Sequence, residues 1–198
     1  MNLSISPKQK SSHGAFTLME LLVVITIILI LAGMAFPGAK GVLDRARKTS
    51  AENSALQLKQ SIAAYYTEYR RYPLPPGDKG GQDIEIRSDN RLMDILLGAD
   101  GNKGNPRRIS FFAGKKAKGN PPRGGLVTSS GGGGELFDPW GEHFYVKMDT
   151  DYNNRLDEPF SKSGDSSSGN EIPESVIVWS TGPDAEKENK DNDNITTW

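Results

Sequence analysis

The chain has 198 residues, with 24 lysine and arginine side chains, 25 aspartate and glutamate side chains and a formal net charge of −1. This balance argues against a protein whose main task is binding nucleic acid. The sequence contains no cysteine, which excludes disulfides, zinc–thiolate sites and cysteine nucleophiles. The length allows one ordinary domain with an appendage.

An apolar run of 21 residues, Phe16 to Phe36, contains a single charged residue, Glu20. A helix of this length spans roughly 31 Å, which matches the hydrocarbon core of a bilayer. The 15 residues before it contain Lys8 and Lys10 and no acid, so the positive-inside rule predicts a cytoplasmic amino terminus and a single membrane crossing, with residues 37–198 on the far side. A cleaved secretory signal peptide is the alternative, although its apolar core is usually shorter.

Residues 14–24, GAFTLMELLVV, resemble the leader junction and amino-terminal helix of type IV pilins and type II secretion pseudopilins. The resemblance implies a leader over residues 1–15, which prepilin peptidase removes before it methylates the new amino group of Phe16. It also implies that Glu20 neutralises the terminal amine of a neighbouring subunit during assembly. An ion pair is a sound reason for a carboxylate in an apolar helix, where an unpaired charge is costly.

The cleavage position departs from the family pattern, in which glycine directly precedes the phenylalanine. Here Ala15 precedes Phe16, and Gly14 stands one step earlier. Cleavage after Ala15 makes Glu20 the fifth mature residue, as in the family, whereas cleavage after Gly14 makes it the sixth. The spacing therefore favours cleavage after Ala15. The alternative is a plain signal anchor that is not processed.

Beyond the apolar run, residues 37–72 have the pattern of an amphipathic helix that ends before Pro73. The apolar positions, mostly three or four residues apart, are Leu43, Ala46, Ala51, Ala55, Leu58, Ile62, Tyr65 and Tyr69. Together with Tyr66 and Tyr72, the last tyrosines also allow a stacking platform for nucleic-acid bases, but their spacing favours core packing. We therefore expect residues 37–72 to form the spine of the domain, that is, the helix on which the rest of the domain packs.

Residues 73–134 are rich in glycine and proline, and only Asn90–Leu97 has the pattern of a short helix. Charge is segregated along the chain. Residues 37–134 carry 17 basic and 9 acidic side chains, a net charge of +8, and residues 135–198 carry 5 and 15, a net charge of −10. A basic stretch in this region contacts phosphates or acidic partners, or is a solvated loop; its members are Lys115, Lys116, Lys118 and Arg123.

Residues 135–198 are predicted to form a sheet followed by an acidic segment. Residues 143–148 and 175–180 are rich in aromatic and β-branched residues, and we expect these two strands to pair. The turn before the first strand, DPWG at residues 138–141, resembles the signature of the G-type major pseudopilin of type II secretion. This second resemblance favours a pseudopilin over a pilin.

The loop between the two strands has oxygen ligands at positions 1, 3, 5 and 9 of an EF-hand-type calcium loop, namely Asp149, Asp151, Asn153 and Asp157. Asn154 stands where a glycine is usual, but asparagine tolerates the left-handed conformation. Position 12 is Phe160, so the bidentate carboxylate is missing. The alternative is an acidic turn stabilised by Asx hydrogen bonds.

The last segment, from Ser180 to Trp198, resembles the calcium loop of the G-type pseudopilin. The resemblance implies a structural calcium ion that staples the tail to the sheet, with backbone carbonyls completing the site. The implied side-chain ligands are Asp184, Asp191, Asp193 and Asn194. Asn194 replaces an aspartate of the family pattern.

The predicted fold is therefore α+β, with a long amino-terminal helix packed on a small antiparallel sheet with long loops. The resemblance implies a non-enzymatic pseudopilin of the bacterial inner membrane that assembles in the periplasm. Its implied partners are other copies of itself, prepilin peptidase, the inner-membrane secretion platform, other pseudopilins and membrane lipid, with no nucleic acid. The alternatives are a type IV pilus subunit, for adhesion, motility or DNA uptake, and a tethered calcium-binding domain that never polymerises.

Overall fold

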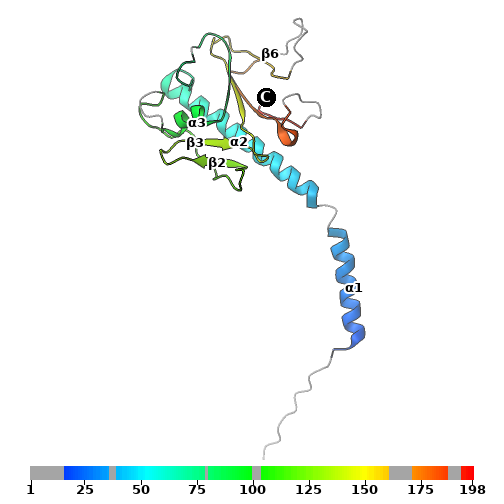
Figure 1. The fold of residues 1–198 in the computed structure, drawn as a ribbon. Coiled ribbons are helices and arrows are strands. Elements are labelled where there is room, and N and C mark those ends of the chain that lie inside the picture. Colours follow the sequence, from blue (N-terminus) through cyan, green and yellow to red (C-terminus); the bar gives the residue numbers. More distant parts are fainter. Residues whose placement is uncertain (1–15, 36–38, 79, 100–103, 161–170, 187–192) are drawn as a thin grey trace, which may run out of the picture. The chain divides into compact units, whose positions relative to one another are not determined.

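The computed structural model describes residues 16–35, 39–78, 80–99, 104–160, 171–186 and 193–198. The chain divides into two compact units, Met1–Leu43 and Asp44–Trp198, and the second unit holds the sheets. The predicted α+β class is confirmed, because a helix packs against a small antiparallel sheet (Figure 1).

The first helix is α1 (Leu18–Ala35), whose first turn contains Glu20. Its large apolar side chains are exposed, from Leu18 at 88% to Val24 at 45%. In the described part of the chain, no helix combines the length and the apolarity that crossing a membrane requires. The membrane-spanning helix over residues 16–36 therefore stays a prediction.

The second helix, α2 (Ala39–Tyr69), is the predicted amphipathic spine. Its buried face consists of Ala51, Ala55, Leu58, Ile62 and Tyr65, at the predicted spacing. The first two residues of the predicted stripe, Leu43 and Ala46, are exposed. Among the described residues the core begins only at Ala51, so this correction shortens the packed part of the helix. Residues 36–38, which precede α2, lie outside the described residues.

The helix ends at Tyr69, three residues before the predicted end at Tyr72. Arg70 has a φ of 52°, a left-handed conformation that stops the helix before Pro73. The tyrosines at this end are packed, since Tyr65 is 1% and Tyr72 is 7% exposed. Tyr66 and Tyr69 are half-buried and pack against the same core, so the prediction of core packing is confirmed.

The central sheet has four antiparallel strands, and its order is β1 (Ile84–Arg87), β4 (Tyr145–Met148), β7 (Val176–Ser180), β8 (Ile195–Thr196). The predicted pairing of residues 143–148 with residues 175–180 is confirmed by β4 and β7, in which Val146 lies opposite Val178.

The two faces of the sheet carry separate cores, because side chains alternate between the faces along each strand. Ile86, Val146 and Val178 join the core that contains the buried face of α2. Ile177 and Trp179 belong to a second core with residues of β5 (Leu156–Asp157) and β6 (Glu171–Ile172), which pair with each other.

Residues 73–134 hold more regular structure than predicted. Helix α3 (Asn90–Leu97) confirms the predicted short helix, and the side chain of Asp89 caps it by accepting the N–H of Arg91 at 3.0 Å. The structure adds β1 and β2 (Gly125–Thr128); β2 pairs with β3 (Gly134–Phe137), next to α3 (Figure 1). Each added strand has only four residues, which is too short for alternation to be visible in the sequence.

Candidate functional site

The amino-terminal end of α1 is closed by reciprocal hydrogen bonds between Thr17 and Glu20. The Thr17 hydroxyl accepts the backbone N–H of Glu20 at 3.2 Å, and the Glu20 carboxylate accepts the backbone N–H of Thr17 at 3.0 Å. The same carboxylate accepts the Thr17 hydroxyl proton at 3.0 Å. This is a capping box, in which side chains satisfy N–H groups that have no partner within the helix.

The capping box gives Glu20 a structural role in addition to its predicted role in assembly. Thr17 and Glu20 are both exposed, and Phe16 beside them is 74% exposed, so a cationic group can approach the carboxylate. The other predicted processing residues, Gly14 and Ala15, lie outside the described residues. Of the predicted processing and assembly site, the structure describes Phe16 and Glu20. The carboxylate of Glu20 is accessible and is held at the beginning of an apolar helix.

The DPWG turn is organised by the carboxylate of Asp138, which is fully buried. Its Oδ1 accepts the backbone N–H groups of Trp140, Gly141 and Glu142 at 2.9, 2.7 and 3.0 Å. Gly141 has a φ of 107°, a conformation that favours glycine. The aspartate and the glycine are therefore required by the backbone of the turn.

The other carboxylate oxygen of Asp138 joins this turn to the carboxyl-terminal segment. Oδ2 accepts the hydroxyl proton of Ser180 at 2.6 Å, and Ser180 Oγ accepts the N–H of Gly182 at 3.1 Å. Gly182 begins the short helix η1 (Gly182–Asp184) with a φ of 74°. A Cβ on Gly182 would lie 2.7 Å from the carbonyl oxygen of Asp193, so the two segments touch there. The two motifs that resemble the G-type pseudopilin thus form one connected unit.

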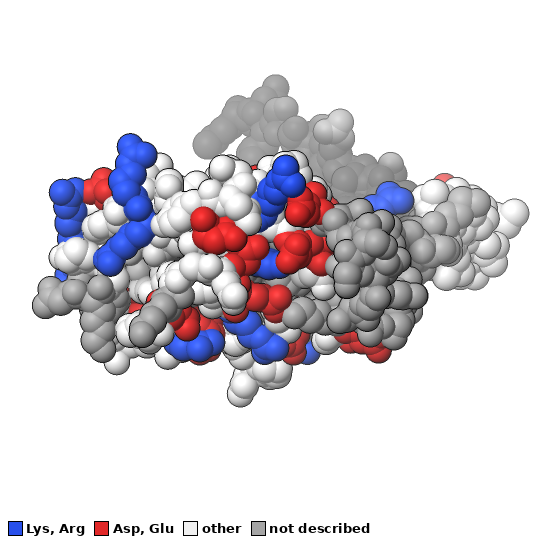
Figure 2. Space-filling model, turned by 90° about the horizontal axis from the view of Figure 1, so that it is seen from above, with Lys and Arg blue, Asp and Glu red and all other residues white. Residues whose placement is uncertain are grey.

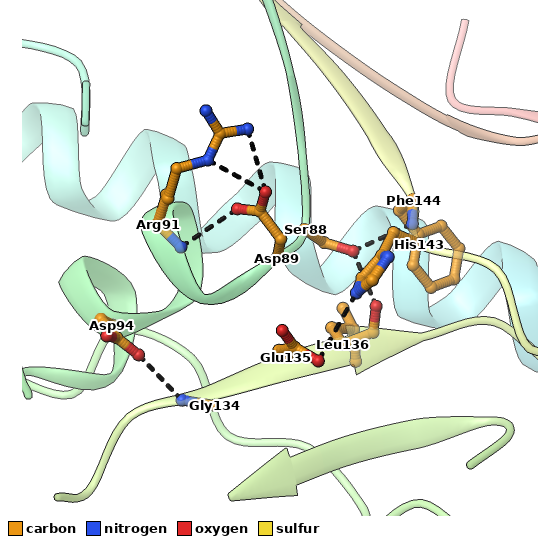
Figure 3. A network of polar contacts seen from close by, with 9 residues as sticks. All are labelled: Ser88, Asp89, Arg91, Asp94, Gly134, Glu135, Leu136, His143 and Phe144. Atoms are coloured by element: carbon orange, nitrogen blue, oxygen red, sulfur yellow. Dashed lines mark hydrogen bonds and ion pairs between the residues drawn. The ribbon is translucent and has the colours of Figure 1, made fainter. Parts of the chain in front are cut away.

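A second polar network fastens the β2–β3 pair to the central sheet and to α3 (Figure 3). The buried hydroxyl of Ser88 donates to the carbonyl of Leu136 at 2.7 Å and accepts the N–H of Phe144 at 2.9 Å. Asp94 of α3 accepts the N–H of Gly134 at 3.0 Å. Sequence reasoning did not single out Ser88, because its partners lie far away along the chain.

His143, next to this network, is the only histidine among the described residues. Its Nε2 lies 3.8 Å from a carboxylate oxygen of Glu135, and its ring centroid lies 4.4 Å from that of Phe137. Within the described residues, its Nε2 has no hydrogen-bond partner.

The acidic loop after β4 folds around the carboxylate of Asp149, which is 1% exposed. Its two oxygens accept the N–H groups of Asn153 at 3.1 Å and Asn154 at 2.7 Å. The side chain of Asp151 accepts the N–H of Asn153 at 3.1 Å, and the side chain of Asn153 accepts the N–H of Arg155 at 2.7 Å. The Asx hydrogen bonds of the alternative interpretation are therefore present, and Asn154 has the expected left-handed conformation, with a φ of 60°.

The structure brings a third carboxylate, Asp83, to this loop. Carboxylate oxygens of Asp83, Asp149 and Asp151 all lie within 4.8 Å of one another. Asp83 directly precedes β1, and the pairing of Ile84 with Met148 places it beside Asp149. Sequence reasoning missed Asp83 because only the register between β1 and β4 reveals this neighbourhood.

The environment of Asp83 disfavours its ionised form. Burial raises the pKa of Asp83 above its usual value, and the charge of Asp151 raises it further. Asp157, another predicted ligand, contributes to the same shift, and its carboxylate lies 3.9 Å from Lys147 Nζ. Among the described residues, Oδ1 of Asp83 has no hydrogen-bond donor. Clustered carboxylate oxygens are the hard donors that calcium prefers, so the side chains present fit this cation.

The carboxyl-terminal acidic segment lies only partly within the described residues, since Asp191 lies outside them. Asp193 packs at Gly182, and its Oδ1 is buried without a hydrogen-bond donor in the described part of the chain. Asn194 follows directly. Asp184 and Asp193 do not gather with a third acidic or histidine side chain among the described residues. A calcium site in this segment stays a prediction.

Comparison with known proteins matches residues 10–36 to the family described as "Prokaryotic N-terminal methylation motif". The chain is 29% identical over 96 residues to the type IV major pilin protein PilE1 of Neisseria gonorrhoeae, covering 43% of this chain and 53% of that protein. It is 34% identical over 65 residues to the type II secretion system core protein G of Aeromonas hydrophila, covering 33% and 46%. It is 36% identical over 96 residues to the fimbrial protein EcpC of Eikenella corrodens, covering 48% and 61%.

The chain thus spans about half the length of these curated relatives. No solved structure matches it. The matched motif contains Phe16, Thr17 and Glu20, the residues at the capped beginning of α1. The motif and these relatives support the superfamily of type IV pilins and type II secretion pseudopilins for this chain.

Proposed function

We propose that this chain is a structural subunit of a type II secretion pseudopilus, a periplasmic filament that promotes protein export. The observation that carries this choice is the hydrogen bond between Asp138 and Ser180, which joins the two segments that resemble the G-type pseudopilin. The similarity to the type II secretion system core protein G supports the same choice.

In this proposal, the precursor sits in the bacterial inner membrane with its amino terminus in the cytoplasm. Prepilin peptidase cleaves after Ala15 and methylates the amino group of Phe16. The exposed apolar side chains of α1 are covered by lipid before assembly and by α1 of other copies in the filament, because so much apolar surface is not stable in water. The secretion platform and other pseudopilins are the remaining proposed partners.

The carboxylate of Glu20 pairs with the terminal amine of a neighbouring copy during assembly. Its exposure at the first turn of α1 supports this role, and so does the cost of leaving a charge unpaired among apolar helices. The bond to Thr17 holds the carboxylate in place before the amine arrives.

A type IV pilus subunit is the second candidate, and the similarity to PilE1 and to EcpC favours it. The amino-terminal features are common to both candidates. The Asp138–Ser180 unit and a sequence without cysteine favour the pseudopilin, because the carboxyl-terminal segment is held without a disulfide.

Deleting the gene in its own bacterium separates the two candidates. We expect the loss of exported proteins from the medium, with surface pili retained, and restoration by the wild-type gene but not by a gene encoding Glu20→Val. Loss of surface pili with normal export would favour the type IV pilus subunit. No change in either, with the protein present in the membrane, would favour a tethered domain that does not polymerise.

The proposal includes one structural calcium ion at the acidic loop after β4. Asp83, Asp149 and Asp151 would hold it, and Asp157 is a further carboxylate whose charge acts on Asp83. The cation would offset the mutual repulsion of these carboxylates and fasten the loop to the edge of the sheet.

A further inference from the structure

An open groove of about 700 Å³ runs beside the amino-terminal half of α2. Residues 112–115 form its other wall. Two hydrogen bonds join the walls. Lys115 Nζ donates to Ser50 Oγ of α2 at 2.7 Å, and the Gln57 amide of α2 donates to the carbonyl of Ala113. Arg45 and Lys115 line the groove, whereas no acidic side chain does. The groove is therefore positively charged.

The positive charge continues beyond the groove, on a segment that the structure fixes in place. Ala117 donates its N–H to the carbonyl of Leu126 at 2.9 Å, and the backbones of Lys118 and Arg123 exchange hydrogen bonds of 3.0 and 2.8 Å. The segment is thus a solvent-exposed loop, as the alternative interpretation expects, whose backbone is held by hydrogen bonds. We define the basic end as Arg45, Lys115, Lys116, Lys118 and Arg123. All five are exposed, and none forms an ion pair within the described residues.

Negative charge gathers near the other end of α2. We define the acidic end as Asp83, Asp149, Asp151 and Asp157, whose charges act on one another. Tyr152, in the same loop and 54% exposed, stacks on Tyr72 with ring centroids 5.9 Å apart, and its centroid lies 6.4 Å from that of Tyr66 in the last turn of α2. Within the described residues, Asp83, Asp149 and Asp151 form no ion pair.

The two ends are too far apart to neutralise each other within one chain. Ser50 and Tyr66 mark them on α2, and the helix rises about 24 Å between these residues. The Debye length at physiological ionic strength is only about 8 Å. Figure 2 shows several acidic side chains in the middle of one face, with single basic side chains among them and further basic side chains toward one side.

We propose that the basic end of one copy binds the acidic end of a second copy that has the same orientation and is displaced along α2. The inference rests on the proposed function, in which copies assemble in parallel. One chain supplies both charged surfaces. The basic end forms no ion pair among the described residues, and in the acidic end only Asp157 is paired, with Lys147 at 3.9 Å, so four carboxylates outnumber the charge of this lysine and one divalent cation. The groove offers walls that are already fixed. A head-to-tail contact of this kind does not close on itself and therefore propagates as a filament.

Introduced cysteines test the contact directly, because the full chain has none of its own. We choose Ala113→Cys at the groove and Gln82→Cys beside Asp83, since both residues are exposed and neither side chain is charged. Under mild oxidation of filaments in the bacterial envelope, a chain with both cysteines should give a ladder of disulfide-linked multimers. Each single variant should not. The matched control combines Gln82→Cys with Ala63→Cys, on an exposed part of α2 near the acidic end, and should give no ladder.

Charge variants in the double-cysteine chain test the cause of the contact. Lys115→Glu or Asp151→Lys alone should lower the linked fraction at least about tenfold, on the scale of close charge pairs at interfaces. Both together should restore most of it, which excludes misfolding as the reason for the loss. Arg108→Glu, the same charge change at an exposed residue outside the basic end, should not lower it.

Normal filaments without the ladder would overturn this inference and leave the proposed function standing. A ladder unaffected by the charge variants would also overturn it. If Lys115→Glu weakens binding to phosphatidylglycerol vesicles but leaves the ladder intact, the basic end serves lipid phosphate and the inference is wrong. Failure of the wild-type chain to form any filament would instead contradict the proposed function.

Discussion

Asp138 and Ser180 are hydrogen-bonded at 2.6 Å, and neither residue has any exposed surface. Through this bond, one carboxylate organises the turn before β4 and also positions the turn that follows β7. The carboxyl-terminal segment, which packs at Gly182, is therefore anchored to the sheet by a polar contact. In a chain without cysteine, this contact takes the place that a disulfide holds in many small secreted domains.

Removing the Ser180 hydroxyl or the Asp138 carboxylate should destabilise the fold, and the loss of the carboxylate should have the larger effect. Ser180→Ala should lower the free energy of unfolding by about 1–3 kcal/mol, because one buried carboxylate oxygen loses its donor. Asp138→Ala should cost about 2–4 kcal/mol, since three backbone N–H groups of the turn also lose their acceptor.

Urea denaturation of the full chain in detergent, followed by circular dichroism, measures these differences. Glu142→Ala is the matched control, because its side chain is exposed in the same turn; its effect should stay within about 0.5 kcal/mol. A Ser180→Ala protein as stable as the control would contradict the anchoring role.

The two roles of Glu20 can be separated by three variants at the beginning of α1. Thr17→Ala weakens the cap by about 0.5–2 kcal/mol but keeps the carboxylate, so filaments should still form. Glu20→Gln keeps a capping oxygen but removes the charge, and Glu20→Val removes both; neither should assemble, although both should remain in the membrane. Electron microscopy and sedimentation of envelope filaments measure assembly. Filaments from Glu20→Gln would show that the charge is dispensable.

The pKa of Asp83 makes stability depend on pH and on calcium. Because burial and Asp151 raise this pKa, the folded state binds a proton more tightly than the unfolded state. The resulting stability is present at low pH and is lost as the pH rises through the folded pKa. At neutral pH without calcium, Asp83→Asn should therefore raise the melting temperature.

Calcium should reverse this effect. The wild-type chain should gain stability when calcium replaces chelator, and Asp83→Asn should lose most of that gain. Differential scanning calorimetry of the full chain in both buffers measures it, with Asp78→Asn, an exposed aspartate outside the cluster, as the control. An equal calcium response in wild type and Asp83→Asn would rule out the site at this loop.

The carboxyl-terminal ligands call for a separate pair of substitutions. Replacing Asp184 and Asp193 by alanine should lower the melting temperature only in the presence of calcium, if this segment binds the cation. The same loss in chelator would mean that Asp193 acts through packing at Gly182. These outcomes are independent of those at Asp83.

Elements with strong local signals could be predicted from the sequence. The buried face of α2 repeats over several turns, α3 has a dense apolar face and a capping residue, and β4 and β7 are rich in β-branched and aromatic residues. The end of α2 was placed too late, because a left-handed residue, Arg70, stops the helix before Pro73.

The features that escaped prediction depend on contacts between distant parts of the chain. β1 and β2 are four residues long, and Asp83 joins Asp149 only because β1 pairs with β4 in one particular register. The DPWG turn and the carboxyl-terminal turn were visible as separate motifs, but nothing in their spacing indicates that Asp138 reaches Ser180. Ser88 was missed for the same reason.

The most direct test of the account is the intact mass and first residue of the protein recovered from the membranes of its own bacterium. Processing as a pilin-type precursor predicts a chain that begins at Phe16, carries one methyl group on its terminal nitrogen and lacks residues 1–15. A mature chain that still begins at Met1, or one that begins beyond Pro37, would contradict processing and with it the proposed assembly through Glu20.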